Sequence, residues 1–149
     1  ARLVAALREG KALPVDLRGQ TVFYAGPTPP PPGKPTGAIG PTTACRMDSF
    51  TPELLHYGVR ALIGKGQRSD AVKQAIAETG SVYFAAIGGC AAYMAACVEQ
   101  CEVLAYDDLG TESIKRLEVR ELPVTVAVDC YGGDAYEQGR KAYLSQTEK

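Results

Sequence analysis

The sequence predicts an α/β fold with one central sheet flanked by helices, within a single domain spanning residues 1–149. Three observations predict this class. Short apolar runs rich in β-branched and aromatic residues alternate along the chain with segments of helical periodicity. The connections between them are short, which favours parallel strands with helices on the sheet faces. The chain has 149 residues, of which 46% are hydrophobic and 22% charged, as in one folded domain with its own core.

The first half of the chain is predicted to alternate helices and strands around one long Gly/Pro-rich loop. Apolar positions at helical spacing predict the first helix, and β-branched and aromatic residues predict the strands. Ser49 or Thr51 can cap the second helix, whereas Ser69 and Gly80 mark the ends of the third. In chain order we expect a helix over 3–7, a strand over 21–25, the loop over 26–41, a helix over 52–57, a strand over 59–63 and a helix over 70–79.

The second half is predicted to continue this alternation. A double glycine at Gly88–Gly89 joins a buried strand to a helix of small residues, where it permits close strand–helix packing. Thr111 can cap a short helix further along. We expect a strand over 82–87, a helix over 90–98, a strand over 103–106, a helix over 112–115, a strand over 124–129 and a helix over 134–144.

Charge and hydropathy exclude several classes of function. The 16 basic and 17 acidic residues give a net charge of -1, which argues against nucleic acid or an anionic membrane as the main partner. No apolar run approaches the roughly 18 residues that span a bilayer. The first ten residues alternate apolar and charged positions, unlike a secretory signal. We therefore expect a cytoplasmic protein.

The cysteines indicate free thiols in a reducing compartment. Their number is odd, and a chain of this length does not need disulfides to fold. There is one histidine, His56, and only Cys97 and Cys101 are closely spaced, so no metal site is predicted on this chain. The five cysteines are Cys45, Cys90, Cys97, Cys101 and Cys130.

The segment GPTTACRMD (40–48) is the most informative part of the sequence. Gly40 lets the backbone approach a ligand closely, and the adjacent hydroxyls of Thr42 and Thr43 supply donors and acceptors. If a helix or turn begins here, free backbone N–H groups and the guanidinium of Arg46 point at one spot, which suits a carboxylate or phosphate. The alternative is a capping segment in which a threonine caps and Arg46 is solvated.

A second candidate anion-binding segment is IGKGQRS (63–69), in which Lys65 stands between two glycines after a strand. It lacks the G-x-x-x-x-G-K-[ST] pattern of a phosphate-binding loop, and a plain surface turn is the alternative. In a parallel sheet, ligands gather at the loops beyond the carboxyl ends of the strands. We therefore expect the loops over 26–46, 64–69 and 88–90 to meet.

Five stretches of the sequence closely resemble one family: YAGPTP, GPTTACRMDSFTPELL, LIGKGQRS, FAAIGGCAA and AYDDLGTESIKRLEVRELPVTVAVDCYGGDAY. The family is the iron–sulfur (class I) fumarate hydratases, at their β subunit or C-terminal domain. L-tartrate dehydratase β subunits share these motifs. The resemblance runs from about residue 3 to about residue 136.

The resemblance implies a swivelling β/β/α domain and the reversible hydration of fumarate to L-malate. It implies a [4Fe–4S] cluster that is bound by a partner α subunit rather than by this chain. It further implies an α2β2-type assembly, with a β–β homodimer as the expected state of the isolated chain.

By resemblance, Thr42, Thr43 and Arg46 fall on a threonine pair and an arginine that line the family's active site, and Lys65 falls on its lysine. We assign proton transfer to Thr43 with Thr42 orienting, and carboxylate binding to Arg46 and Lys65 beside Gly40. The family also carries a Gly-Arg-Asp segment before the first helix, whose arginine joins the site. This chain begins after that point, so its N-terminal edge is expected to be incomplete.

Two alternative functions remain open at this stage. One is a β subunit of L-tartrate dehydratase or of a mesaconase-like enzyme, because this half of the site does not separate the substrates. The other is a non-catalytic module that binds an anion in the same pocket. Cys45 and Cys90 occupy small-residue positions beside the active-site segments, and we assign them no ligand role.

Overall fold

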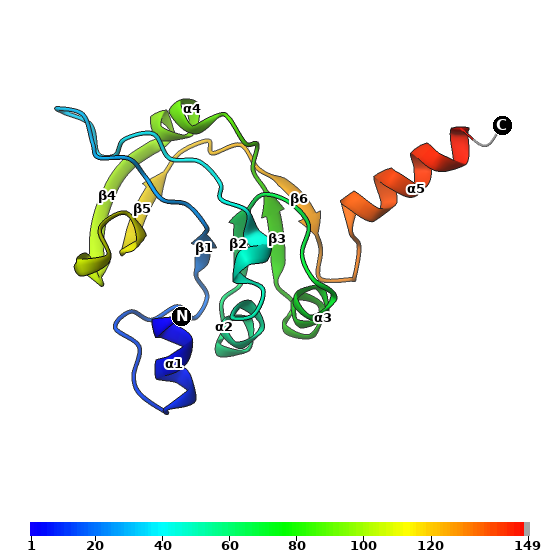
Figure 1. Cartoon of the computed structure of the whole chain (residues 1–149), viewed down its shortest axis with the longest axis horizontal. Coiled ribbons are helices and arrows are strands. Elements are labelled where there is room, and N and C mark those ends of the chain that lie inside the picture. Colours follow the sequence, from blue (N-terminus) through cyan, green and yellow to red (C-terminus); the bar gives the residue numbers. More distant parts are fainter. Residues whose placement is uncertain (148–149) are drawn as a thin grey trace.

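The computed structural model describes residues 1–147, and its centre is a four-stranded sheet in the order β1-β2-β3-β6 (Figure 1). β1 (Thr21–Phe23), β2 (Ala61–Gly64) and β3 (Val82–Ala85) are parallel, whereas β6 (Thr125–Val128) runs antiparallel to β3. The predicted α/β fold with a central sheet flanked by helices is confirmed. The antiparallel last strand makes the sheet mixed.

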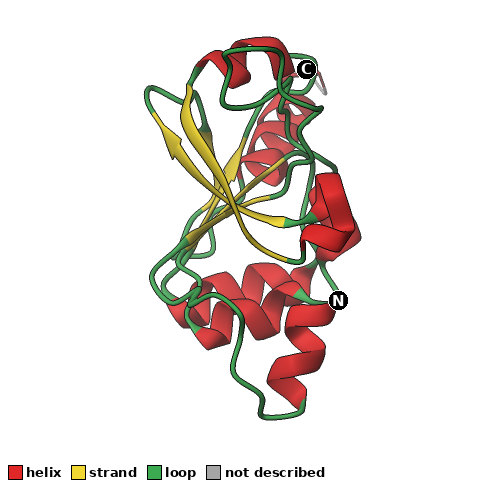
Figure 2. Ribbon diagram, turned by 90° about the vertical axis from the view of Figure 1, so that its left-hand side faces the viewer, coloured by secondary structure: helices red, strands yellow, loops and turns green. Residues whose placement is uncertain are grey.

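One face of the sheet is covered by a layer of three helices, which Figure 2 shows on one side of the strands. β2 illustrates how both faces become buried. Leu62 packs into the core cluster that these helices form, and its neighbour Ile63 packs into a second cluster with Met94. Successive strand residues point to opposite faces, so an uninterrupted apolar strand fits a sheet covered on both sides. The three helices are α1 (Arg2–Arg8), α2 (Thr51–Tyr57) and α3 (Asp70–Thr79).

The boundaries of these three helices lie within one residue of the predictions, and Ser69 takes the predicted N-cap position of α3, whereas the N-cap predicted for α2 from Ser49 or Thr51 is wrong. Thr51 is the first residue of α2, and its hydroxyl donates to the carbonyl of Met47 (2.9 Å). Ser69 occupies the N-cap position of α3, yet its hydroxyl makes no capping bond. Gly80 does end α3 in the left-handed conformation (φ 65°), as its lack of a Cβ allows.

A two-stranded antiparallel ribbon lies beside the sheet in Figure 1. It consists of β4 (Val98–Ala105) and β5 (Ile114–Val119), joined by the 3-10 segment η2 (Asp107–Glu112). The turn between them is closed by side chains, because the carbonyl of Gly110 accepts from Ser113 Oγ (2.7 Å) and Lys115 Nζ (2.8 Å). The ribbon follows directly on α4 (Ala91–Ala96).

The predictions for this ribbon are wrong in three places. The helix predicted over 90–98 ends at Ala96, the strand predicted over 103–106 begins at Val98, and the helix predicted over 112–115 is absent from the described chain. Most of β4 is exposed and carries charged residues between its apolar ones, so it lacks the apolar run by which a buried strand is recognised. Pairing with β5, rather than burial, defines it.

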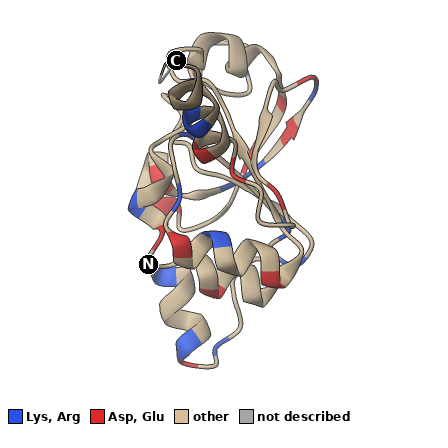
Figure 3. Ribbon diagram, turned by 90° about the vertical axis from the view of Figure 1, so that its right-hand side faces the viewer, with Lys and Arg blue, Asp and Glu red and all other residues tan. Residues whose placement is uncertain are grey.

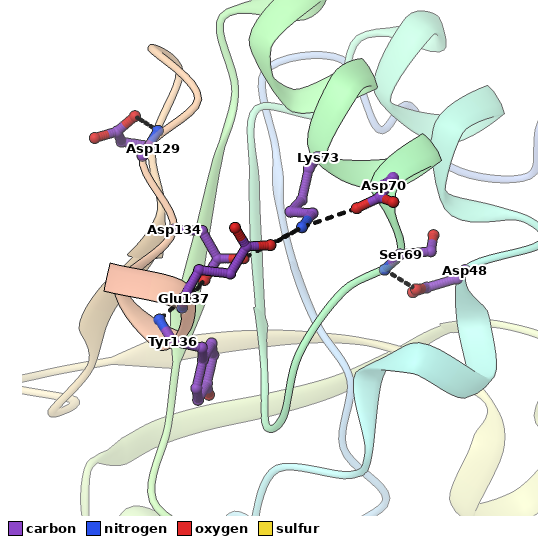
Figure 4. A network of polar contacts seen from close by, with 9 residues as sticks. Asp48, Ser69, Asp70, Lys73, Asp129, Asp134, Tyr136 and Glu137 are labelled. Atoms are coloured by element: carbon purple, nitrogen blue, oxygen red, sulfur yellow. Dashed lines mark hydrogen bonds and ion pairs between the residues drawn. The ribbon is translucent and has the colours of Figure 1, made fainter. Parts of the chain in front are cut away.

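The last helix, α5 (Ala135–Thr147), projects from the end of β6 and away from the body of the molecule (Figure 1). Asp134 fixes its start, since Oδ1 accepts the backbone N–H groups of Tyr136 (2.9 Å) and Glu137 (3.3 Å). Lys73 of α3 ties this start to the body through ion pairs with Asp134 (3.5 Å) and Glu137 (2.6 Å), seen in Figure 4. The hydrogen bond to Glu137 is the main cause that raises the pKa of Lys73.

Candidate functional site

Backbone hydrogen bonds bring the two predicted anion-binding segments side by side. The N–H of Thr42 donates to the carbonyl of Tyr24 (2.7 Å), just beyond the end of β1. The N–H of Lys65 donates to the carbonyl of Thr42 (3.2 Å), and the N–H of Ala44 donates to the carbonyl of Lys65 (3.0 Å). Thr43 and Lys65 thus form a parallel bridge past the carboxyl ends of β1 and β2. The predicted meeting of these two loops is confirmed.

The 3-10 helix η1 (Ala44–Met47) decides where the guanidinium of Arg46 lies. The turn brings the side chain of Arg46 back toward Thr42, and Arg46 Nη2 donates a hydrogen bond to Thr42 Oγ1. Thr43 occupies the N-cap position of η1, but its side chain makes no capping bond. The capping alternative is therefore met in position only: Thr43 makes no capping bond, and Arg46, although exposed, is hydrogen-bonded to Thr42.

Lys65 is half-buried and lies against the third predicted loop. A Cβ built on Gly88 would meet Lys65 Cδ and Nζ at 3.5 Å, so the glycine loop after β3 forms one wall beside the ammonium group. Within residues 1–147, neither Lys65 nor Arg46 forms an ion pair with a carboxylate. Arginine and lysine side chains without such a counter-ion can bind the carboxylate groups of an anion.

The absence of a side chain at glycine positions allows these segments to pack closely. A Cβ on Gly64 would stand 2.9 Å from the Cβ of Ala44, so a side chain at residue 64 would push the two anion-binding segments apart. Gly40 packs on the start of α4 instead, where a Cβ would stand 3.1 Å from the Cβ of Ala91. The structure therefore gives Gly40 a packing role, and contact with a ligand stays a prediction for it.

A buried polar group behind the site was not predicted. The side chain of Arg68 has an exposed fraction of 0%, and its Nε and Nη2 donate to Asp48 Oδ1 (2.8 Å) and Thr51 Oγ1 (2.9 Å). The other carboxylate oxygen of Asp48 accepts the backbone N–H of Ser69 (2.6 Å), as Figure 4 shows. One feature of the sequence could have indicated this ion pair. Each predicted anion-binding segment carries one of its members: Asp48 ends RMD, and Arg68 lies in GKGQRS.

Residues 1–147 do not present a ligand set that fits an iron–sulfur cluster. No group of three or more His, Cys, Asp or Glu residues that could hold a metal is found in the described part of the chain. Cys97 ends α4 and is buried, with its thiol facing the carbonyls of Tyr93 and Glu121 (3.6 Å each), whereas Cys101 lies on β4. The two thiols therefore do not share a helix face.

The side of the described chain that Figure 3 draws carries charges of both signs. Basic and acidic residues are interspersed over the helices and strands of the side drawn in Figure 3. Among residues 1–147, we find no helix of the length and apolar character that crossing a membrane requires.

Comparison with known proteins identifies relatives over almost the entire chain. The family model described as "Fumarase C-terminus" matches residues 1–139. The anaerobic class I fumarate hydratase of Escherichia coli strain K12 is 39% identical over 140 residues, which are 93% of this chain and 26% of the relative. The mitochondrial fumarate hydratase 1 of Leishmania major is 41% identical over the same shares.

A relative of similar size is known as well. A Methanocaldococcus jannaschii protein, provisionally named L(+)-tartrate dehydratase subunit beta, is 33% identical over 154 residues, which are 99% of this chain and 79% of the relative. By contrast, the chain spans about a quarter of the length of the fumarate hydratases it matches.

Proposed function

The chain belongs to the fumarase C-terminal domain family, and from this membership we propose that it supplies the substrate-binding half of a hydro-lyase active site. The proposed reaction is the reversible addition of water to fumarate, giving L-malate. The observation that supports the proposal is the backbone bridge between Thr43 and Lys65, beside which Arg46 donates to Thr42 Oγ1. Within residues 1–147, neither Arg46 nor Lys65 forms an ion pair with a carboxylate.

The cations suit a dicarboxylate. Arg46 presents a planar fork that can hold one carboxylate through two hydrogen bonds, and Lys65 presents a point charge for the other. Binding both ends fixes the carbon–carbon double bond between them, which lowers the entropic cost of reaching the transition state.

The hydroxyls suit proton transfer at the substrate carbon. Thr42 Oγ1 already accepts a hydrogen bond from Arg46, so we assign Thr42 to orienting the guanidinium. Thr43 makes no side-chain hydrogen bond to the described residues, which leaves its hydroxyl available to substrate. A threonine is a weak base in water, and the neighbouring cations would stabilise the alkoxide it needs.

We assign the remaining parts of the site to a partner. The matched tartrate dehydratase relative is named a subunit beta, and about three quarters of each matched fumarate hydratase lies outside this domain. In our proposal the partner is an iron–sulfur α subunit or a preceding domain, and the assembly is of α2β2 type. Its [4Fe–4S] cluster would supply a Lewis acid for the substrate's oxygens. We further propose that the assembled enzyme is located in the cytoplasm.

Metal-independent folding is a first expected result. The purified chain should fold without iron and show no hydratase activity, because its thiols are not arranged as cluster ligands. Iron analysis and circular dichroism after anaerobic cluster reconstitution measure both properties. Stoichiometric iron on this chain alone, lost in a Cys97→Ser, Cys101→Ser variant, would contradict the assignment of the cluster to the partner.

The partner is expected to dock on the face that carries the site. Ile87 is 71% exposed and directly precedes Gly88, at which a Cβ would meet the side chain of Lys65. Ile87→Asp should lower affinity for the partner by about tenfold or more, since an apolar contact becomes a buried charge. Titration calorimetry with the purified partner measures this change.

The matched control for that titration is Tyr143→Asp on α5, because Tyr143 is 66% exposed and lies on the projecting helix. We expect this variant to bind the partner as the wild type does. Loss of binding in Tyr143→Asp with retention in Ile87→Asp would place the interface on α5 instead.

A tartrate dehydratase is the second candidate function. It is favoured by the Methanocaldococcus jannaschii relative, of which the chain covers 79%. Assays of the assembled enzyme on fumarate, malate, tartrate and mesaconate separate the two enzymes. Binding of these anions without turnover of any of them would favour the non-catalytic module.

A further inference from the structure

We infer that Arg68 is a positioning residue, whose buried guanidinium holds the segment carrying Thr42, Thr43 and Arg46 in register with the segment carrying Lys65. Its effect on catalysis rests on the proposed function, whereas its effect on the geometry of the two segments does not. Arg68 itself lies in the core and is not placed in contact with substrate.

The polar contacts of Arg68 join the segment carrying Arg46 to the segment carrying Lys65 on their buried side. Arg68 follows Lys65 by three residues, and the groups that accept its hydrogen bonds, Asp48 and Thr51, follow Arg46 closely. Asp48 doubles this connection by accepting the backbone N–H of Ser69 with its second oxygen. The carboxylate therefore fixes both the side chain of Arg68 and the backbone beside it.

Two tyrosines extend the connection to the site itself. The guanidinium carbon of Arg68 lies 5.3 Å from the ring centre of Tyr24 and 5.0 Å from that of Tyr83, within the range of cation–π contact. The carbonyl of Tyr24 accepts the N–H of Thr42 (2.7 Å). The hydroxyl of Tyr83 donates to the carbonyl of Gly66 (2.9 Å), the residue after Lys65.

Stability alone does not account for this arrangement. Arg68 Nη1 is buried and has no hydrogen-bond partner within the described chain, and an unpaired buried donor is unfavourable. Buried ion pairs are often no more stabilising than apolar residues of similar volume. An apolar side chain would fill the same space without directional contacts to Asp48 and Thr51, so it would not fix the relative position of the segments.

Amide hydrogen exchange on the full chain tests the geometry without reference to any activity. In Arg68→Lys and Arg68→Met, we expect the amides of Ala44 and Lys65 to exchange at least tenfold faster, because their hydrogen bonds cross between the two segments. The amide of Ile76 in α3 should change much less. Equal acceleration at all three amides, or no acceleration, would overturn the inference.

Two further variants keep the test decisive. Arg60→Met is the matched control, since Arg60 precedes β2 at the opposite end of that strand and contacts the carbonyl of Thr79. It should leave the Ala44 and Lys65 amides unchanged. If the Arg68 variants do not fold, Tyr83→Phe removes only the hydroxyl that holds Gly66. Unchanged exchange of the Lys65 amide in Tyr83→Phe would then count against the inference.

Kinetics of the assembled enzyme test the consequence for substrate binding. Arg68→Lys should raise KM several-fold and lower kcat by about tenfold. Misplaced binding groups weaken both the binding of substrate and the stabilisation of the transition state. A merely smaller folded fraction would lower kcat and leave KM unchanged, which would contradict a positioning role. A wild-type enzyme without hydratase activity would defeat the proposed function, and the exchange results would still decide the role of Arg68.

Discussion

Thr43→Ala is expected to reduce kcat of the assembled enzyme by about 10² or more, with a smaller change in KM. The reason is that the hydroxyl of Thr43 is the one proposed to move a proton at the substrate carbon. Substrate binding would remain, because Arg46 and Lys65 are untouched. Steady-state kinetics with fumarate and L-malate measure both parameters.

Two further variants separate the proposed roles of the Thr43 and Thr42 hydroxyls. Thr43→Ser keeps the hydroxyl and should retain most of kcat. Thr42→Ala removes the hydroxyl that accepts from Arg46, so it should raise KM as well as lower kcat. Near wild-type turnover in Thr43→Ala would place the base elsewhere, on the partner.

The parallel half of the sheet was predictable because local and global signals agree there. β1, β2 and β3 are short apolar strands separated along the chain by helices, and such strands pair in parallel with helices packed on the sheet. Parallel strands bring their carboxyl ends to one edge, so the meeting of Thr43 and Lys65 followed from the order of elements.

The ribbon was not predictable for the opposite reason. β4 and β5 obtain their stability from pairing with one another, and much of each strand faces solvent. A single strand of this kind has no period that distinguishes it from a loop or a short helix. The antiparallel pairing of β6 with β3 likewise depends on where the ribbon returns the chain.

Arg68 was missed because charge in a sequence normally indicates exposure. Its burial depends on Tyr24, which directly follows β1, on Tyr83 of β3, and on Asp48 from the other anion-binding segment. None of these neighbours is close in sequence. Only the folded chain shows that the two motifs are joined in the core as well as at the surface.

Arg46 is the residue whose removal should most weaken substrate binding. Arg46→Ala removes both the charge proposed to bind a carboxylate and the donor to Thr42, so kcat/KM should fall by about 10² or more. Most of that loss should be in KM, because the proposed proton-transfer group remains.

Arg46→Lys decides whether charge or shape matters at this position. A lysine restores the positive charge but cannot form two parallel hydrogen bonds to one carboxylate, nor hold Thr42 while binding substrate. We therefore expect Arg46→Lys to recover little of the lost kcat/KM, measured with fumarate on the assembled enzyme. Arg60→Lys, at the far end of β2, is the control and should behave as wild type. Full recovery in Arg46→Lys would show that only the charge is needed, and the bidentate geometry would have to be abandoned.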